Sequence, residues 1–250
     1  MKIAVINFSG NVGKSTIARH LLLPRIDGAP LITVESLNAD EDQGQALRGR
    51  QFGELQEYLQ TVDSVVVDIG ASNVEELLAL MHRYRGSHED FDCFVVPTVP
   101  ARKQQQDTIA TLVELAQLGV PPSRLKLLFN MVEGDADIED AFDILLAFLK
   151  KHPLAQANPS CRLGLNEVYG RAKGLVGVSV KPAAGAPVDL TALARDDTDY
   201  KSMILGSSNM TEKIYLAQCL ATRRLAMGVV PELDACFAAL ELAPVPACVE

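Results

Sequence analysis

The sequence lacks the features of several large classes of protein. Its five cysteines are scattered and include no C-x-x-C pair: Cys93, Cys161, Cys219, Cys236 and Cys248. This spacing argues against a zinc site or a disulfide framework. No apolar run reaches about 18 residues, so we expect no membrane span. The apolar start, residues 1–7, is too short for a signal-peptide core, so we expect no export and a cytoplasmic location.

Basic residues are also in short supply. The chain has 23 Lys and Arg against 32 Asp and Glu, a formal net charge of -9. Sequence-independent binding of nucleic acid needs clustered basic residues that neutralise phosphates. We therefore expect no strong direct nucleic-acid surface, and any link to DNA to run through a partner protein. The 48% of hydrophobic residues is ordinary for a globular protein and argues against wholesale disorder.

Short apolar runs alternate with helical patterns along the first 130 residues. The expected strands are residues 2–7, 30–34, 64–69, 93–98 and 125–130. The expected helices are residues 14–23, 44–61, 74–84 and 103–118. This alternation predicts an α/β fold with a doubly wound, mostly parallel sheet and helices on both faces. A ligand is expected beyond the carboxyl ends of the strands.

The pattern changes in the second half of the chain. We expect a helix, a last strand and a short helix at residues 136–151, 161–165 and 166–173, respectively. A proline-rich stretch at residues 182–187 then has the composition of a linker. Helices at residues 190–194 and 211–227 follow it. We therefore expect a P-loop domain over residues 1–180 and a helical extension over residues 181–250, packed on the same domain.

The first strand leads into a glycine loop and then a helix. The expected phosphate-binding residues are Gly10, Asn11, Val12, Gly13, Lys14, Ser15 and Thr16. Backbone N–H groups and the positive end of a helix converge on an anion in such a loop. We expect Lys14 to reach the β and γ phosphates, Ser15 to bind magnesium and Thr16 to donate to the α phosphate.

The sequence of this loop differs from the full P-loop pattern, because Phe8 stands where that pattern has its first glycine. The alternative is a tight strand-to-helix turn that happens to be followed by Lys-Ser. The position of the loop between a strand and a helix favours the phosphate-binding interpretation.

Two acidic residues end expected strands. Asp68 closes a buried strand in the form of a Walker B element, which predicts a catalytic role and a place in the magnesium shell near Ser15. Glu35 ends the second strand and is a candidate for binding magnesium or positioning the attacking water. Asp40, Glu41 and Asp42, in the loop that follows, are alternatives for this role, and a solvated acidic loop is another interpretation.

Asn130 ends the fifth strand, and its side-chain amide is suited to hydrogen-bond the edge of a nucleotide base. A GTP-specific site places Lys after this Asn and Asp two residues further on, whereas this chain has Met131 and Glu133. Adenine is the better expectation.

These motifs together resemble the ParA/MinD class of deviant Walker P-loop ATPases, a SIMIBI-like group, over roughly residues 1–180. Within it the loop is most similar to that of the StbB plasmid-stability proteins. The resemblance implies ATP or ADP and Mg²⁺ as cofactors and a nucleotide-dependent homodimer. It further implies an ATP-dependent molecular switch in plasmid stability, partition or conjugation. A plasmid-encoded DNA-binding adaptor protein would be the partner. Membrane-docking relatives carry a basic amphipathic C-terminal helix, whereas residues 231–241 of this chain are acidic, so we expect no membrane binding.

The chain departs from this class at three positions. Ser9 replaces the signature lysine that contacts the partner subunit's phosphates, and Asn11 replaces a glycine. Leu37 replaces the second acid expected after Glu35. Loss of a transition-state cation can cost roughly a thousandfold in rate. Either a cation such as Arg102 or Lys103 substitutes, or hydrolysis is slow.

Two other functions fit the same motifs. One is an ATP-dependent small-molecule kinase or ligase of the same fold, although the sequence offers no second motif for a substrate pocket. The other is a nucleotide-binding scaffold without turnover.

Overall fold

The structure, a computed structural model, describes residues 1–34, 49–134, 136–175 and 188–242. It divides into two compact units. The first is Met1–Leu165 together with the residues from Cys236 onward, and the second is Asn166–Ala235. The boundary expected at residue 180 lies outside the described residues, so the division into residues 1–180 and 181–250 stays a prediction.

A parallel sheet forms the centre of the first unit. Its strand order is β2-β3-β1-β4-β5-β6, and all described pairings are parallel. The strands are β1 (Lys2–Val5), β2 (Leu31–Thr33), β3 (Val65–Asp68), β4 (Cys93–Thr98), β5 (Leu125–Val132) and β6 (Arg162–Gly164). The six predicted strands are thereby confirmed, and the P-loop strand β1 lies directly between β3 and β4.

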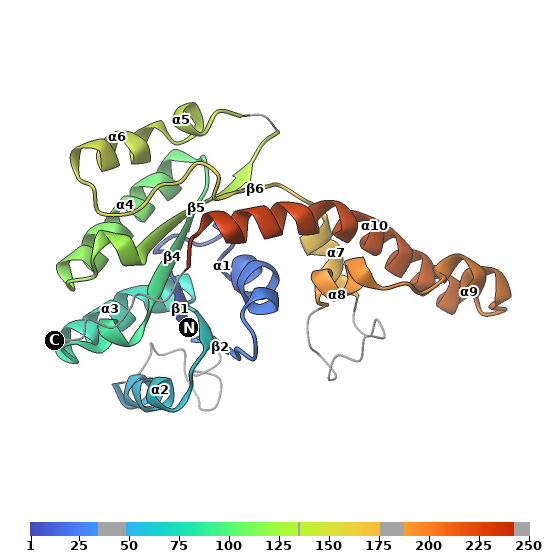
Figure 1. The fold of residues 1–250 in the computed structure, drawn as a ribbon, viewed down its shortest axis with the longest axis horizontal. Coiled ribbons are helices and arrows are strands. Elements are labelled where there is room, and N and C mark those ends of the chain that lie inside the picture. Colours follow the sequence, from blue (N-terminus) through green and yellow to red (C-terminus); the bar gives the residue numbers. More distant parts are fainter. Residues whose placement is uncertain (35–48, 135, 176–187, 243–250) are drawn as a thin grey trace. The chain divides into compact units, whose positions relative to one another are not determined.

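Helices cover both faces of this sheet, as Figure 1 shows. The chain leaves β1 in one direction, toward β2, and then crosses the sheet in the other direction through β3, β4, β5 and β6. Right-handed crossovers place helices on opposite faces when the direction reverses. One face carries α1 (Lys14–Thr16), and the other carries α2 (Gly49–Thr61), α3 (Val74–Arg83), α4 (Arg102–Gln117) and α6 (Asp143–Lys151). The predicted α/β class is confirmed.

Short helical turns complete the first unit. A π-helical segment, Ile17–Leu22, continues α1, and a 3-10 turn, Leu23–Arg25, follows it. Proline lacks the N–H that an α-helix needs, so Pro24 is consistent with the end of this helix near residue 23. Three more 3-10 turns connect elements: Ala71–Asn73, Ser87–Asp90 and Pro122–Arg124.

The core between the sheet and α2, α3, α4 and α6 is apolar and rich in phenylalanine. Phe129 of β5 and Phe142 lie with ring centroids 4.7 Å apart, and Phe91 and Phe94 lie 5.3 Å apart. All four are completely buried. Burial of each such side chain contributes about 1.5–3 kcal/mol to the stability of the fold. Phe142 also interrupts the predicted helix 136–151. Its φ of -122° separates α5 (Ile138–Ala141) from α6, where its ring packs on Phe129.

The second unit is helical. It contains α7 (Val168–Gly174), α8 (Leu190–Arg195), α9 (Tyr200–Gly206) and most of α10 (Met210–Ala239). Aspartates begin two of these helices, because Asp189 accepts from the N–H of Thr191 at 2.8 Å and Asp199 accepts from that of Ser202 at 3.2 Å. The sequence pattern did not predict α9.

Helix α10 is longer than the predicted 211–227. It continues through Pro231, which cannot donate the backbone hydrogen bond of a helix interior. Apolar burial on both sides of the proline accompanies this continuation, since Val229 and Leu233 are each only 1% exposed. Among the described helices, none combines the length and the apolar character that a membrane crossing requires.

Candidate functional site

The glycine loop lies where the chain direction reverses, at the carboxyl end of β1. Two of its residues adopt left-handed backbone conformations, Gly13 at φ 87° and Asn11 at φ 59°. Glycine takes this conformation without a Cβ clash, and asparagine is among the side chains that tolerate it best. The replacement of a glycine by Asn11 is therefore compatible with the loop.

Lys14 lies across this loop. Its side chain is only 7% exposed, and its Nζ donates to the carbonyl oxygens of Asn7 at 3.1 Å and Ser9 at 2.7 Å. A buried ammonium group needs such partners because burial without them is costly. The structure thus places the predicted phosphate-binding lysine inside the loop, held by the backbone that precedes it.

Asn130 of β5 also belongs to this site. Its Nδ2 donates to the carbonyl oxygen of Val12 at 2.9 Å, and the side chain is 6% exposed. A Cβ atom on Gly13 would overlap Nδ2 of Asn130. The missing side chain of Gly13 therefore allows the amide to reach the loop. The predicted role of Asn130 in adenine recognition stays a prediction, and its bond to the loop is an added finding.

Asp68 lies beside the P-loop strand. It pairs in register with Val5 of β1, and its side chain is 2% exposed. The hydroxyl of Ser15 is at the start of α1, on an exposed residue. Carboxylate and hydroxyl oxygens are suitable ligands for Mg²⁺, which usually takes one or two protein groups and completes its shell with water and phosphate. These residues therefore fit the ion as a donor set, and the described residues contain no larger cluster of three or more His, Cys, Asp or Glu that could hold a metal.

The second strand reaches the same edge of the sheet. The N–H of Val34 donates to the carbonyl oxygen of Asp68 at 3.0 Å. Glu35 is the next residue, and it lies outside the described residues, as do Asp40, Glu41, Asp42 and Leu37. The roles predicted for these positions stay predictions.

The position of the signature lysine is buried. Ser9 is 5% exposed, and its carbonyl oxygen is one of the two that accept from Lys14. Arg102 and Lys103, the candidate substitute cations, are exposed in the first turn of α4. They follow β4, whose carboxyl end lies at the same edge of the sheet as the loop.

The sequence interpretation missed three residues that contact the loop. The Nδ2 of Asn7 donates to Thr108 Oγ1 at 2.8 Å, and the N–H of Phe8 donates to Thr111 Oγ1 at 3.0 Å. A polar residue at the end of a buried strand was the available signal for Asn7. No comparable signal existed for Thr108 and Thr111, which lie in a helix of mostly polar sequence.

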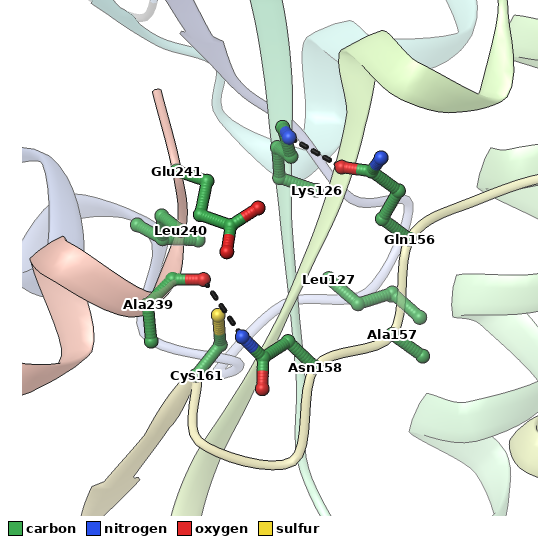
Figure 2. Close-up of a pocket in the computed structure, with 9 residues that line it drawn as sticks. All are labelled: Lys126, Leu127, Gln156, Ala157, Asn158, Cys161, Ala239, Leu240 and Glu241. Carbon is green, nitrogen blue, oxygen red and sulfur yellow. Dashed lines mark hydrogen bonds between the residues drawn. The ribbon is translucent and has the colours of Figure 1, made fainter. Parts of the chain in front are cut away.

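A separate pocket of about 270 Å³ lies near the start of β5 (Figure 2). Three of its polar side chains bond within the pocket: Lys126 contacts Gln156 Oε1, and Asn158 Nδ2 donates to Ala239 O at 3.0 Å. Burial raises the pKa of Cys161, which also lines it, to about 11, so this thiol is neutral near pH 7. Ligands of open α/β sheets bind beyond the carboxyl ends of the strands, and the glycine loop is therefore the better candidate site.

Comparisons with known proteins give a limited result. No protein-family model matches the chain, and no curated protein matches it. Similar solved structures include apo McdA from Cyanothece, at 13% identity, 96% coverage of this chain, 97% of that chain and a TM-score of 0.49. Another is a putative plasmid partition protein from Borrelia burgdorferi B31 bound to AMPPNP. It has 14% identity and a TM-score of 0.43, and the match covers 66% of this chain and 87% of that chain. A third is the ATP complex of a Cyanothece McdA variant. It has 12% identity and a TM-score of 0.42, and the match covers 91% of this chain and 96% of that chain. The assignment of fold and site rests on the sheet order and loop of this chain.

Proposed function

We propose that the chain binds ATP with magnesium and acts as a slowly hydrolysing molecular switch of the ParA/MinD type. One observation carries this proposal. Lys14 is held by two loop carbonyls, at the start of a helix and at the strand where the chain direction reverses. A lysine, loop amides and a helix start at one point suit the phosphates of a nucleotide.

Each residue of the site has a part in this proposal. Amides of residues 10–16 and Lys14 bind the phosphates. Ser15 and Asp68 hold the ion, which neutralises phosphate charge when bound. Glu35 binds the ion or orients water, and Asn130 recognises the adenine edge. Loops after Glu35 and Asp68 are the segments that respond to the γ phosphate, because the strands before them, β2 and β3, end at the same edge of the parallel sheet as β1.

Slow turnover follows from position 9. Ser9 has no charge and is buried, so it supplies no cation to a partner subunit. If a cation compensates in a nucleotide-dependent dimer, Arg102 and Lys103 are the candidates, because both are exposed on the first turn of α4. Without compensation we expect hydrolysis to be slow, and a chain with no turnover would be a nucleotide-binding scaffold.

The biological setting rests on the resemblance of the loop to that of StbB proteins. A role in plasmid stability, partition or conjugation, with a DNA-binding adaptor as partner, agrees with the net charge of -9, which does not favour direct DNA binding. Two similar structures are a putative partition protein bound to AMPPNP and the ATP complex of a McdA variant, and these ligands are those of the two proteins concerned.

Phosphate release with ATP and magnesium tests the proposal. We expect slow, multiple-turnover release from the wild-type chain and none above background from Lys14→Ala. Binding without turnover would instead favour the scaffold. Phosphoryl transfer from ATP to a metabolite in a substrate screen would favour a kinase or ligase and would contradict the switch.

A further inference from the structure

Two threonines of α4 contact the chain where it enters the loop. Thr108 and Thr111 are completely buried and lie one helical turn apart. Thr108 Oγ1 accepts from Asn7 Nδ2 at 2.8 Å, and Thr111 Oγ1 accepts from the N–H of Phe8 at 3.0 Å. Helix α4 therefore holds both residues that precede Ser9.

The hydroxyl protons of these threonines are used within α4. Thr108 Oγ1 donates to Gln104 O at 2.7 Å, and Thr111 Oγ1 donates to Asp107 O at 2.8 Å. A hydroxyl has one proton and a carbonyl can only accept, so the two hydroxyls act as acceptors toward Asn7 and Phe8. Thr98 Oγ1 also lies 3.1 Å from Thr108 Oγ1. Gln104 O is nearer, at 2.7 Å, and is therefore the better acceptor for the Thr108 hydroxyl proton. Valine has the same shape as threonine but offers no acceptor.

Asn7 extends this contact to Lys14. Both Nδ2 protons are used, since Nδ2 also donates to Pro97 O at 2.8 Å, and Oδ1 accepts from the N–H of Ser9 at 2.7 Å. The carbonyl oxygens of Asn7 and Ser9 are the two that hold Lys14. The lysine is therefore connected to α4 by consecutive hydrogen bonds through one buried asparagine.

We propose that Asn7, Thr108 and Thr111 are positioning residues that hold the glycine loop and Lys14 in the geometry that binds phosphate. Preorganised donors bind an anion better because they lose less freedom on binding. This inference rests on the proposed nucleotide binding, and it adds α4 as the element that sets the affinity of the loop.

Helix α4 has other anchors, so the contact can be removed without releasing the helix. Gln105 is 1% exposed. Its Nε2 donates to Pro100 O at 2.8 Å and Ala141 O at 3.0 Å, and its Oε1 accepts from the N–H of Leu145 at 3.1 Å. These bonds do not involve the loop.

The test compares the double variant Thr108→Val/Thr111→Val with wild type. Affinity for a fluorescent ATP analogue with magnesium is one measurement, and hydrogen exchange of the peptide that covers residues 5–13 is the other. We expect affinity to fall at least tenfold and exchange to become faster, because the N–H of Phe8 loses its acceptor. Thr108→Ser/Thr111→Ser keeps both hydroxyls and should restore both measurements to within about threefold.

Thr222 provides the matched control. It is 1% exposed, and its hydroxyl donates to Gln218 O four residues earlier at 2.9 Å, in α10. Thr222→Val should leave loop exchange and nucleotide affinity unchanged. If the double valine variant does not fold, Thr111→Val alone carries the same comparison, because Thr111 Oγ1 is the acceptor of the Phe8 N–H.

The outcomes separate the inference from the proposed function. Unchanged affinity and unchanged loop exchange in the valine variants would overturn the inference while leaving nucleotide binding intact. Faster loop exchange in the valine variants together with no nucleotide binding by wild type would show that α4 holds the loop but would overturn the proposed function.

Discussion

Asn130 Nδ2 occupies the space that a side chain on Gly13 would need. The amide uses this position to donate to Val12 O at 2.9 Å, so the end of β5 is tied to the phosphate loop. A glycine with φ 87° is thus required twice at this point, once for its backbone conformation and once for the contact it permits.

Gly13→Ala should therefore be damaging. The alanine would combine a strained φ with an overlap on Asn130, and strained residues of this kind cost about 1–3 kcal/mol each. We expect a lower midpoint in chemical denaturation and loss of ATP binding. Gly10→Ala is the control, because a Cβ there meets no atom within 4 Å, and a loss of stability as large as that of Gly13→Ala would contradict this explanation.

Asn130→Asp replaces the Nδ2 donor with an oxygen that faces the carbonyl of Val12. The loop should bind phosphates less well, because a charged acceptor then faces another acceptor. If Asn130 also recognises adenine, affinity for ATP should fall by more than affinity for inorganic tripolyphosphate. Equal losses for the two ligands, measured by calorimetry, would remove the proposed base contact and leave only the bond to the loop.

Asp68→Asn should affect magnesium more than nucleotide. The amide retains one oxygen but loses the charge that favours a divalent cation. We expect the magnesium concentration for half-maximal phosphate release to rise at least tenfold, while magnesium-free nucleotide affinity changes little. Asp63→Asn, in the chain segment before β3, provides a surface control. Unaltered magnesium dependence in the Asp68 variant would exclude its assignment to the ion.

Cys161 should be unreactive in the folded chain. Burial raises its pKa to about 11, so near pH 8 only about one thiol in a thousand is the reactive thiolate. Alkylation by iodoacetamide, followed by mass spectrometry, should be at least about a hundredfold slower than in denaturant. Because the folded pKa lies above the ordinary value of 9.0, the thiol's contribution to stability is full below pH 9 and is lost as pH rises toward 11. Equal alkylation rates in both states would contradict the burial.

The sequence was sufficient for the sheet and the loop but not for what holds the loop. Strands such as Val65–Asp68 are short, apolar and bounded by turn residues, and these local properties determine them. The contacts of Thr108 and Thr111 depend on how α4 docks on the sheet, which no local pattern contains. Phe142 is similar, because its break in the helical pattern accompanies packing against Phe129, far away in sequence.

The extent of α10 shows the same limit. Proline opposes a helix interior by local rules, and the predicted helix, residues 211–227, ends before Pro231. The burial of Val229 and Leu233 is a property of the folded chain, and tertiary packing overrides the local preference.

The most direct test of the central claim is titration calorimetry of ATP with magnesium into wild type and Lys14→Ala. Thermal unfolding of both chains checks that the variant is folded. The account predicts saturable binding by wild type and a loss of at least a hundredfold in affinity for Lys14→Ala. The reason is that the variant lacks the ammonium group that Asn7 O and Ser9 O hold in the loop and that binds the phosphates. Equal affinity of the two folded chains would contradict it.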